Sequence, residues 1–191
     1  MLPDPLAGVE AALCEHFAQQ PVRASVSFVG VQPIEVLRFE PVPGERAYVS
    51  LGMSRTGMTA ASAGVVDTTG PRAELLLHLR DEIDAHVDVW RQFAVLAAAP
   101  SVEGVVYAAG VTVDLGQPLA PGSGCTGALV VASPLGAVAT AAGQVDVLQV
   151  LPATPNELAW CRVRGGAALR ERWAHQGVDL LDLLRPTADL E

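Results

Sequence analysis

The 191-residue chain contains no lysine, few aromatic residues and only three cysteines. Cys14, Cys125 and Cys161 are widely spaced and form no C-x-x-C pair, which excludes a zinc knuckle or a dithiol redox motif. An odd cysteine count without a visible secretory signal indicates reduced, mostly buried thiols. The longest apolar runs, such as Phe93–Ala99, are too short to cross a bilayer, and no signal peptide is visible. These absences predict a cytoplasmic protein without a membrane partner.

Positive charge is also scarce, because 12 basic residues, all of them arginine, stand against 21 acidic residues. The net charge of −9 repels a phosphate backbone, so direct nucleic-acid binding is not expected. A protein partner steered by charge should instead be basic. Hydrophobic residues make up 50% of the chain and charged residues 17%, which excludes intrinsic disorder. The length suits a single domain over residues 1–191 with its own hydrophobic core.

Apolar periodicity predicts helices at the N-terminus, in the middle and at the C-terminus of the chain. The first two should cover Asp4–Gln19 and Ile83–Ala99, with Pro100 ending the second. Thr154 and Glu157 have the spacing of a capping box, so a third helix should begin there, with a fourth over residues 167–175.

Alternating or compact apolar segments predict the strands. These are Arg23–Phe28, Ile34–Phe39, Arg46–Leu51, Ala73–Leu79, Gly110–Leu115, Gly127–Ala132 and Val145–Leu151. Because strands come in runs and helices are clustered, the pattern predicts an α+β fold. Its sheet should be mixed or mostly antiparallel, with about six to seven strands.

The hexapeptide from Gly122 to Gly127 matches G-x-G-x-x-G, but a predicted strand follows it where a dinucleotide site needs a helix. A flexible hairpin is therefore favoured over a nucleotide site. Cys125 in this loop could act as a nucleophile, yet Ser123 stands where a nucleophile elbow needs glycine. None of the four histidines has a local signature as its base, so a structural thiol is favoured.

The densest acidic run contains Asp81, Glu82, Asp84 and Asp88. Carboxylates beside an imidazole could bind a metal, but acidic residues also favour the first turn of a helix, where they meet its positive end. The run lacks the spacing of a calcium loop. We therefore predict no metal, no cofactor and no enzymatic activity.

Several segments in the C-terminal third, Val147–Leu158, Gly166–Leu169 and Asp182–Pro186, resemble the Suppressor of fused domain family. Upstream, Leu51–Ser54 and Glu74–Leu77 occur in the order that this family uses, and the resemblance spans about Asp4 to Pro186. It implies an α+β protein-binding domain without catalytic residues. Eukaryotic members hold a transcription factor through two domains, and this chain is too short for the second. Stand-alone bacterial domains of this type resemble immunity proteins, which bind and neutralise a cognate toxin.

Two function classes follow. The first is a cytoplasmic protein-binding module, an immunity protein for a basic toxin. Its interface would include Asp81, Glu82, Asp84 and Asp88, with Met53 and Met58 as adaptable apolar contacts. The simpler interpretation is that these carboxylates only solvate and cap the start of a helix. The alternative is a small-molecule-binding or hydrolytic enzyme that uses the Gly52–Gly70 stretch and Cys125. The sequence leaves the oligomeric state open.

Overall fold

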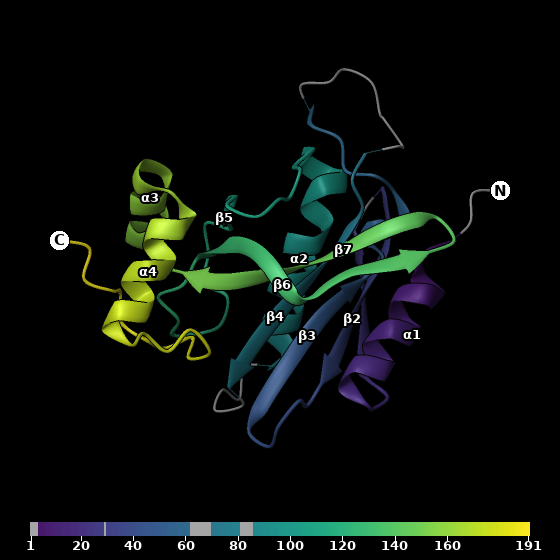
Figure 1. Ribbon diagram of the computed structural model, residues 1–191, viewed down its shortest axis with the longest axis horizontal. Helices are drawn as coiled ribbons and strands as arrows, with labels where there is room; N and C mark the ends of the chain where they lie inside the picture. Colours follow the sequence, from purple (N-terminus) through teal and green to yellow (C-terminus); the bar gives the residue numbers. More distant parts are fainter. Residues whose placement is uncertain (1–3, 29, 62–69, 81–85) are drawn as a thin grey trace.

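The computed structural model describes residues 4–28, 30–61, 70–80 and 86–191, with the backbone alone at residues 31 and 86–88. These residues form one seven-stranded sheet with α-helices on its faces and at one end (Figure 1). The strands are β1 (Val22–Phe28), β2 (Val31–Phe39), β3 (Glu45–Leu51), β4 (Ala73–Arg80), β5 (Thr112–Asp114), β6 (Gly127–Thr140) and β7 (Gly143–Ala153). The helices are α1 (Leu6–Phe17), α2 (His86–Glu103), α3 (Pro155–Arg164) and α4 (Gly166–Gln176), and a 3₁₀ turn, η1, covers Met53–Arg55. The predicted α+β class is confirmed.

The strand order is β1-β2-β3-β4-β7-β6-β5. All neighbours are antiparallel except β4 and β7, which run parallel, so the sheet is mixed as predicted. A parallel pair needs a crossover connection, and here the chain passes through α2, β5 and β6 before β7 lies beside β4. The two edges of the sheet are therefore β1 and the much shorter β5.

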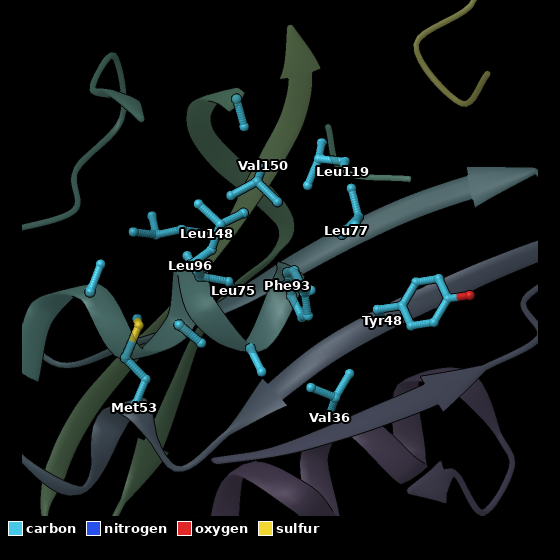
Figure 2. Close-up of a cluster of buried hydrophobic side chains, with 14 of the residues drawn as sticks. Val36, Tyr48, Met53, Leu75, Leu77, Phe93, Leu96, Leu119, Leu148 and Val150 are labelled. Atoms are coloured by element: carbon cyan, nitrogen blue, oxygen red, sulfur yellow. The ribbon is translucent and has the colours of Figure 1, made fainter. Parts of the chain in front are cut away.

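Alternation along the strands gives the sheet two apolar faces. Phe93 and Leu96 of α2 pack in one buried cluster with side chains from β2, β3 and β4, among them Tyr48 and Leu75 (Figure 2). On the opposite face, Val9 and Leu13 of α1 belong to a second cluster, with Leu37, Phe39, Val49, Val145 and Val147. Helices α3 and α4 form a third cluster over the ends of β6 and β7. None of the helices in the described ranges is long and apolar enough to span a membrane.

Pro100 does not end α2, contrary to the prediction, because the helix continues to Glu103. Proline lacks the N–H that would bond to the carbonyl four residues earlier, which belongs to Leu96. The Tyr107 hydroxyl donates to that carbonyl oxygen at 2.7 Å. A side chain from beyond the helix thus replaces the missing backbone bond, and the helix gains its last turn.

The capping box at the start of α3 is confirmed. Thr154 Oγ accepts from the Glu157 N–H at 3.5 Å, and the Glu157 carboxylate accepts from the Thr154 N–H at 2.8 Å. Pro155 follows the cap, as predicted, and Gly177 ends α4 in the left-handed conformation.

We expect Thr154→Ala to lower the free energy of unfolding by about 1 kcal/mol, because one orphan N–H of α3 loses its acceptor. Urea unfolding followed by circular dichroism measures the change. Ser101→Ala, at an exposed residue near the end of α2, is the control and should have little effect. Equal stability of the two variants would contradict the capping role.

Candidate functional site

A groove of about 650 Å³ lies between η1, the segment that follows it and the C-terminal end of α2. Its lining includes Arg55, Met58, Ala61 and Glu103, with Gln32 and Ile34 from β2. Small residues and backbone make up much of the rest. Among its described lining residues, the groove therefore offers shape and backbone hydrogen-bonding groups, with charged side chains from Arg55 and Glu103.

A buried carboxylate holds η1 in place beside the groove. Glu74 of β4 is fully buried and accepts from the Gly52 N–H at 2.8 Å, the Ser54 N–H at 3.0 Å and the Ser54 hydroxyl at 2.7 Å. The Ser50 hydroxyl also donates to it. Burial raises the pKa of Glu74, and the serine hydroxyls and backbone N–H groups offset part of that rise.

Two arginines bind backbone carbonyls at or beside the same turn. Arg55 donates to the Pro33 carbonyl oxygen at 2.6 Å, and Arg72 donates to the carbonyl oxygens of Ser54 and Arg55 at 2.7 and 2.6 Å. Gly52 has a φ of +138°, a conformation that other residues rarely adopt, and an added Cβ would lie 3.1 Å from the Pro33 carbonyl oxygen. Only glycine fits this position, so the groove wall depends on a particular backbone path.

The other wall is joined to α2 by backbone bonds. Met58 N–H donates to the Pro71 carbonyl at 2.8 Å, and Ala61 N–H donates to the Gly104 carbonyl at 3.1 Å. The Tyr107 N–H also lies 3.4 Å from the Met58 sulfur. These contacts tie the described ends of the 52–70 stretch to the sheet and to α2.

The structure describes only some of the predicted interface residues. Met53 and Met58 are 2% and 4% exposed and belong to the core, so a partner would reach Met58 only through the groove. Asp81, Glu82 and Asp84 lie outside the described residues, and Asp88 is described by its backbone alone, near the start of α2. The groove lies at the opposite end of this helix, where its lining begins at Pro100, 12 residues beyond Asp88 and about 18 Å away by helical rise. Asp88 thus lies away from Met58 in the groove, and the role of these residues in binding stays a prediction.

Cys125 is fully buried, and burial raises the pKa of its thiol. The neighbouring Ser123 hydroxyl accepts from the Cys125 N–H at 3.0 Å and donates to the Leu183 carbonyl at 2.6 Å. Cys125 is not among the described residues that line the groove, so the described part of the Gly52–Gly70 stretch and Cys125 do not share that groove. In the described part of the chain, no group of three or more His, Cys, Asp or Glu residues could hold a metal ion.

Glu157 carries a second buried carboxylate. The sequence predicted its capping role, but not its contacts with other segments. Glu157 accepts from both terminal nitrogens of Arg185 at 2.8 Å, from Trp173 Nε1 at 3.1 Å and from the Ala188 N–H at 2.9 Å. Burial raises the pKa of Glu157, but these hydrogen bonds outweigh burial and leave the pKa below the ordinary range. Arg185 also donates to the Pro152 carbonyl at 2.9 Å. The segment after α4 is thereby fastened to the end of β7.

Together these features define an α+β domain whose buried carboxylates support the fold and whose groove has no nucleophile–base pair among the described residues. The sequence model of the Suppressor of fused protein (SUFU) family matches residues 30–186, so the chain belongs to this family. A comparison with curated proteins finds no match.

Solved structures share the fold. The chain is similar to one in the Sufu–Fu complex crystal structure, with a TM-score of 0.66 and 19% identity over 100% of this chain and 92% of that one. It is similar to a SUFU homologue from Neisseria gonorrhoeae, with a TM-score of 0.65 and 19% identity over 95% of each chain. It also resembles Drosophila Suppressor of Fused, with a TM-score of 0.61 and 18% identity, covering 99% of this chain and 51% of that one.

We expect Glu74→Gln to destabilise the protein by about 2 kcal/mol, because the amide nitrogen would face hydrogen-bond donors that now reach a carboxylate oxygen. Denaturant unfolding measures the loss. Glu103→Gln makes the same chemical change at an exposed residue of the groove and should alter stability by no more than about 0.5 kcal/mol. Equal effects would show that Glu74 does not hold η1.

Removing the charge of Glu157 leaves Arg185 buried without a counter-ion, so Glu157→Gln should cost about 3 kcal/mol at neutral pH. Because folding lowers the pKa of Glu157, its contribution is complete above the unfolded-state pKa and declines as pH falls toward the folded-state pKa. The stability difference between wild type and variant should therefore narrow in acid. Urea unfolding over a pH series tests this, with exposed Glu171→Gln as the matched control. A difference independent of pH would contradict the assignment.

Proposed function

We propose that this chain is a protein-binding module and acts as an immunity protein, which binds a basic toxin and neutralises it. Family membership supports protein binding, and the Sufu chain with the same fold has been crystallised in a complex with Fu. The burial of Cys125 and its absence from the described groove lining weigh against a hydrolase.

The distribution of charge on this chain favours a basic partner. The net charge is −9, and many of the arginines bind groups of the same chain. Arg46 pairs with Glu40 at 3.0 Å and Arg80 with Asp179 at 2.8 Å, while Arg55 and Arg72 bind backbone carbonyls. An approaching protein therefore meets an excess of carboxylates. A toxin that acts on a phosphate-containing substrate carries basic groups, which this field attracts.

The acidic run from Asp81 to Asp88 is the proposed centre of electrostatic attraction. It precedes or begins α2, and its charge density exceeds that of any other segment of the sequence. Charge complementarity at this position would raise the association rate and disfavour acidic competitors. The groove at the other end of α2 would then not be required for the first encounter.

The functional test is co-expression with a toxic protein encoded beside the gene for this chain. The immunity proposal expects restored growth and a stable complex of the two purified proteins. The immunity role would be contradicted if this chain is expressed in soluble form and yet fails to relieve the toxicity of any toxic protein encoded beside its gene.

The electrostatic part is tested by association rates at low and high salt. We expect wild type to bind more slowly at high salt, since screening weakens steering. Asp84→Asn with Asp88→Asn should slow association by about threefold to tenfold and reduce its salt dependence. Glu15→Gln with Glu171→Gln removes the same charge at exposed residues of α1 and α4 and is the control. Equal rates for the two double variants would place the interface elsewhere.

The groove itself favours a second candidate, a module that binds a small molecule, because its volume is in the range of ligand sites. Ala60→Trp, at an exposed lining residue, separates the two candidates. Obstructing the groove should abolish ligand-induced thermal stabilisation in this second case and leave toxin neutralisation intact in the first.

A further inference from the structure

Strand β1 forms the longer of the two edges of the sheet. It has seven residues and, within the described ranges, pairs only with β2, whereas the opposite edge strand, β5, has three residues. The strand contains no proline and no acidic residue that could protect an edge, and the whole chain contains no lysine. The register shift opposite Ser27 places the extra residue on β2, so β1 itself has no bulge.

The outward backbone groups of β1 can be assigned from contacts at its start. Glu40, directly after β2, donates its N–H to Gln19 Oε1 and accepts at its carbonyl from Gln19 Nε2, both at 3.0 Å. Gln19 lies just before β1, so the even-numbered residues of β2 direct their backbone groups toward β1. Their partners include Ala24, opposite Val36. By alternation, Arg23 and Ser25 direct their N–H and C=O groups outward.

The segment around β1 differs from the rest of this acidic chain in its charge. Residues 16–34 contain no Asp or Glu, although the chain has 21 such residues. The single arginine in this range, Arg23, binds Glu10 of α1 and Glu35 of β2. Because Arg23 offsets part of the charge of these two carboxylates, a basic partner would find less to attract it here than at the acidic run before α2. Two copies of the same acidic chain could instead approach at this edge with the least like-charge repulsion.

We propose that two copies of this chain associate through β1, which pairs antiparallel with β1 of the second copy about a two-fold axis at Ser25. The two sheets then form one continuous sheet. In this register the outward groups of Ser25 pair with those of its own counterpart, and Arg23 pairs with the second copy's Ser27. Arg23 and its counterpart are kept apart, so no like charges lie opposite each other.

The same register covers the exposed apolar residue at the start of β1. Val22 is 56% exposed and lies opposite the second copy's Phe28, while Ala24 lies opposite Val26. Phe28 and Val26 are partly buried and already pack against the cluster beneath α2. Each apolar residue of one edge therefore lies opposite an apolar residue of the other, and each contact occurs twice, as a self-complementary two-fold interface requires.

The full chain is tested by sedimentation and light scattering over a range of protein concentrations. The proposal expects the mass to rise from one chain toward two. Exchange of backbone amides, followed by nuclear magnetic resonance, should become slower at Arg23 and Ser25 as concentration rises. A chain that remains monomeric at the highest soluble concentration overturns the proposal. So does a dimer whose β1 amides are not protected, or protection of those amides only when another protein is added.

Ser25→Glu places two carboxylates opposite each other at the two-fold axis and should weaken self-association by about tenfold or more. Ala174→Glu adds the same charge at an exposed residue of α4 and should leave the dimer intact. Ser25→Pro removes an outward N–H that β2 does not use and should also prevent pairing. Circular dichroism confirms that each variant folds. Dimers unaffected by both Ser25 substitutions overturn the proposal, and where neither variant folds, the wild-type amide exchange decides.

Discussion

The carboxylate of Glu157 is the group on which the C-terminal third of the molecule depends. It begins α3 through the capping box, receives Trp173 from α4 and binds Ala188 and Arg185 from the segment beyond. Such a buried charge is costly unless each oxygen is paired, and here four residues supply donors. Arg185 extends the connection to the Pro152 carbonyl at the end of β7, and its guanidinium lies 5.5 Å from the Trp173 ring centroid. Without this carboxylate, the start of α3, helix α4 and the segment after α4 would lose their common partner.

Glu74 follows the same physical logic elsewhere in the fold. It collects donors where the chain leaves β3, so a tight turn replaces a continuing strand and one wall of the groove takes its shape. In both cases a carboxylate in the interior holds irregular backbone that apolar packing alone would leave undetermined. The buried acidic residues thus support the structure, and the proposed attraction of a basic partner rests on carboxylates at the surface.

Local patterns predicted most elements, because capping and alternation act over a few residues. The box at Thr154 and the strand alternation of Ile34–Phe39 are examples, and both are confirmed. Prediction failed where a distant group changed the outcome. Tyr107 allows α2 to pass Pro100, and β6 continues to Thr140 through an irregularity where Gly127–Ala132 was expected. The groove and the Glu157–Arg185 pair join residues far apart in sequence, so no local signal indicated either of them.

The two proposed associations depend on opposite features of the same charge distribution. In the proposed dimer, the two-fold axis between the antiparallel β1 strands is perpendicular to the sheet. Both α2 helices would therefore lie on the same face of the joined sheet. The acidic runs at their starts would then add their fields, which favours capture of a basic protein and opposes pairing of the copies. Added salt screens both effects. It should therefore weaken toxin binding while strengthening self-association, because attraction is lost in the first case and repulsion in the second. The strand β1 carries no acidic residue, and its Arg23 binds Glu10 and Glu35, which is what permits one strongly acidic chain to use both kinds of contact.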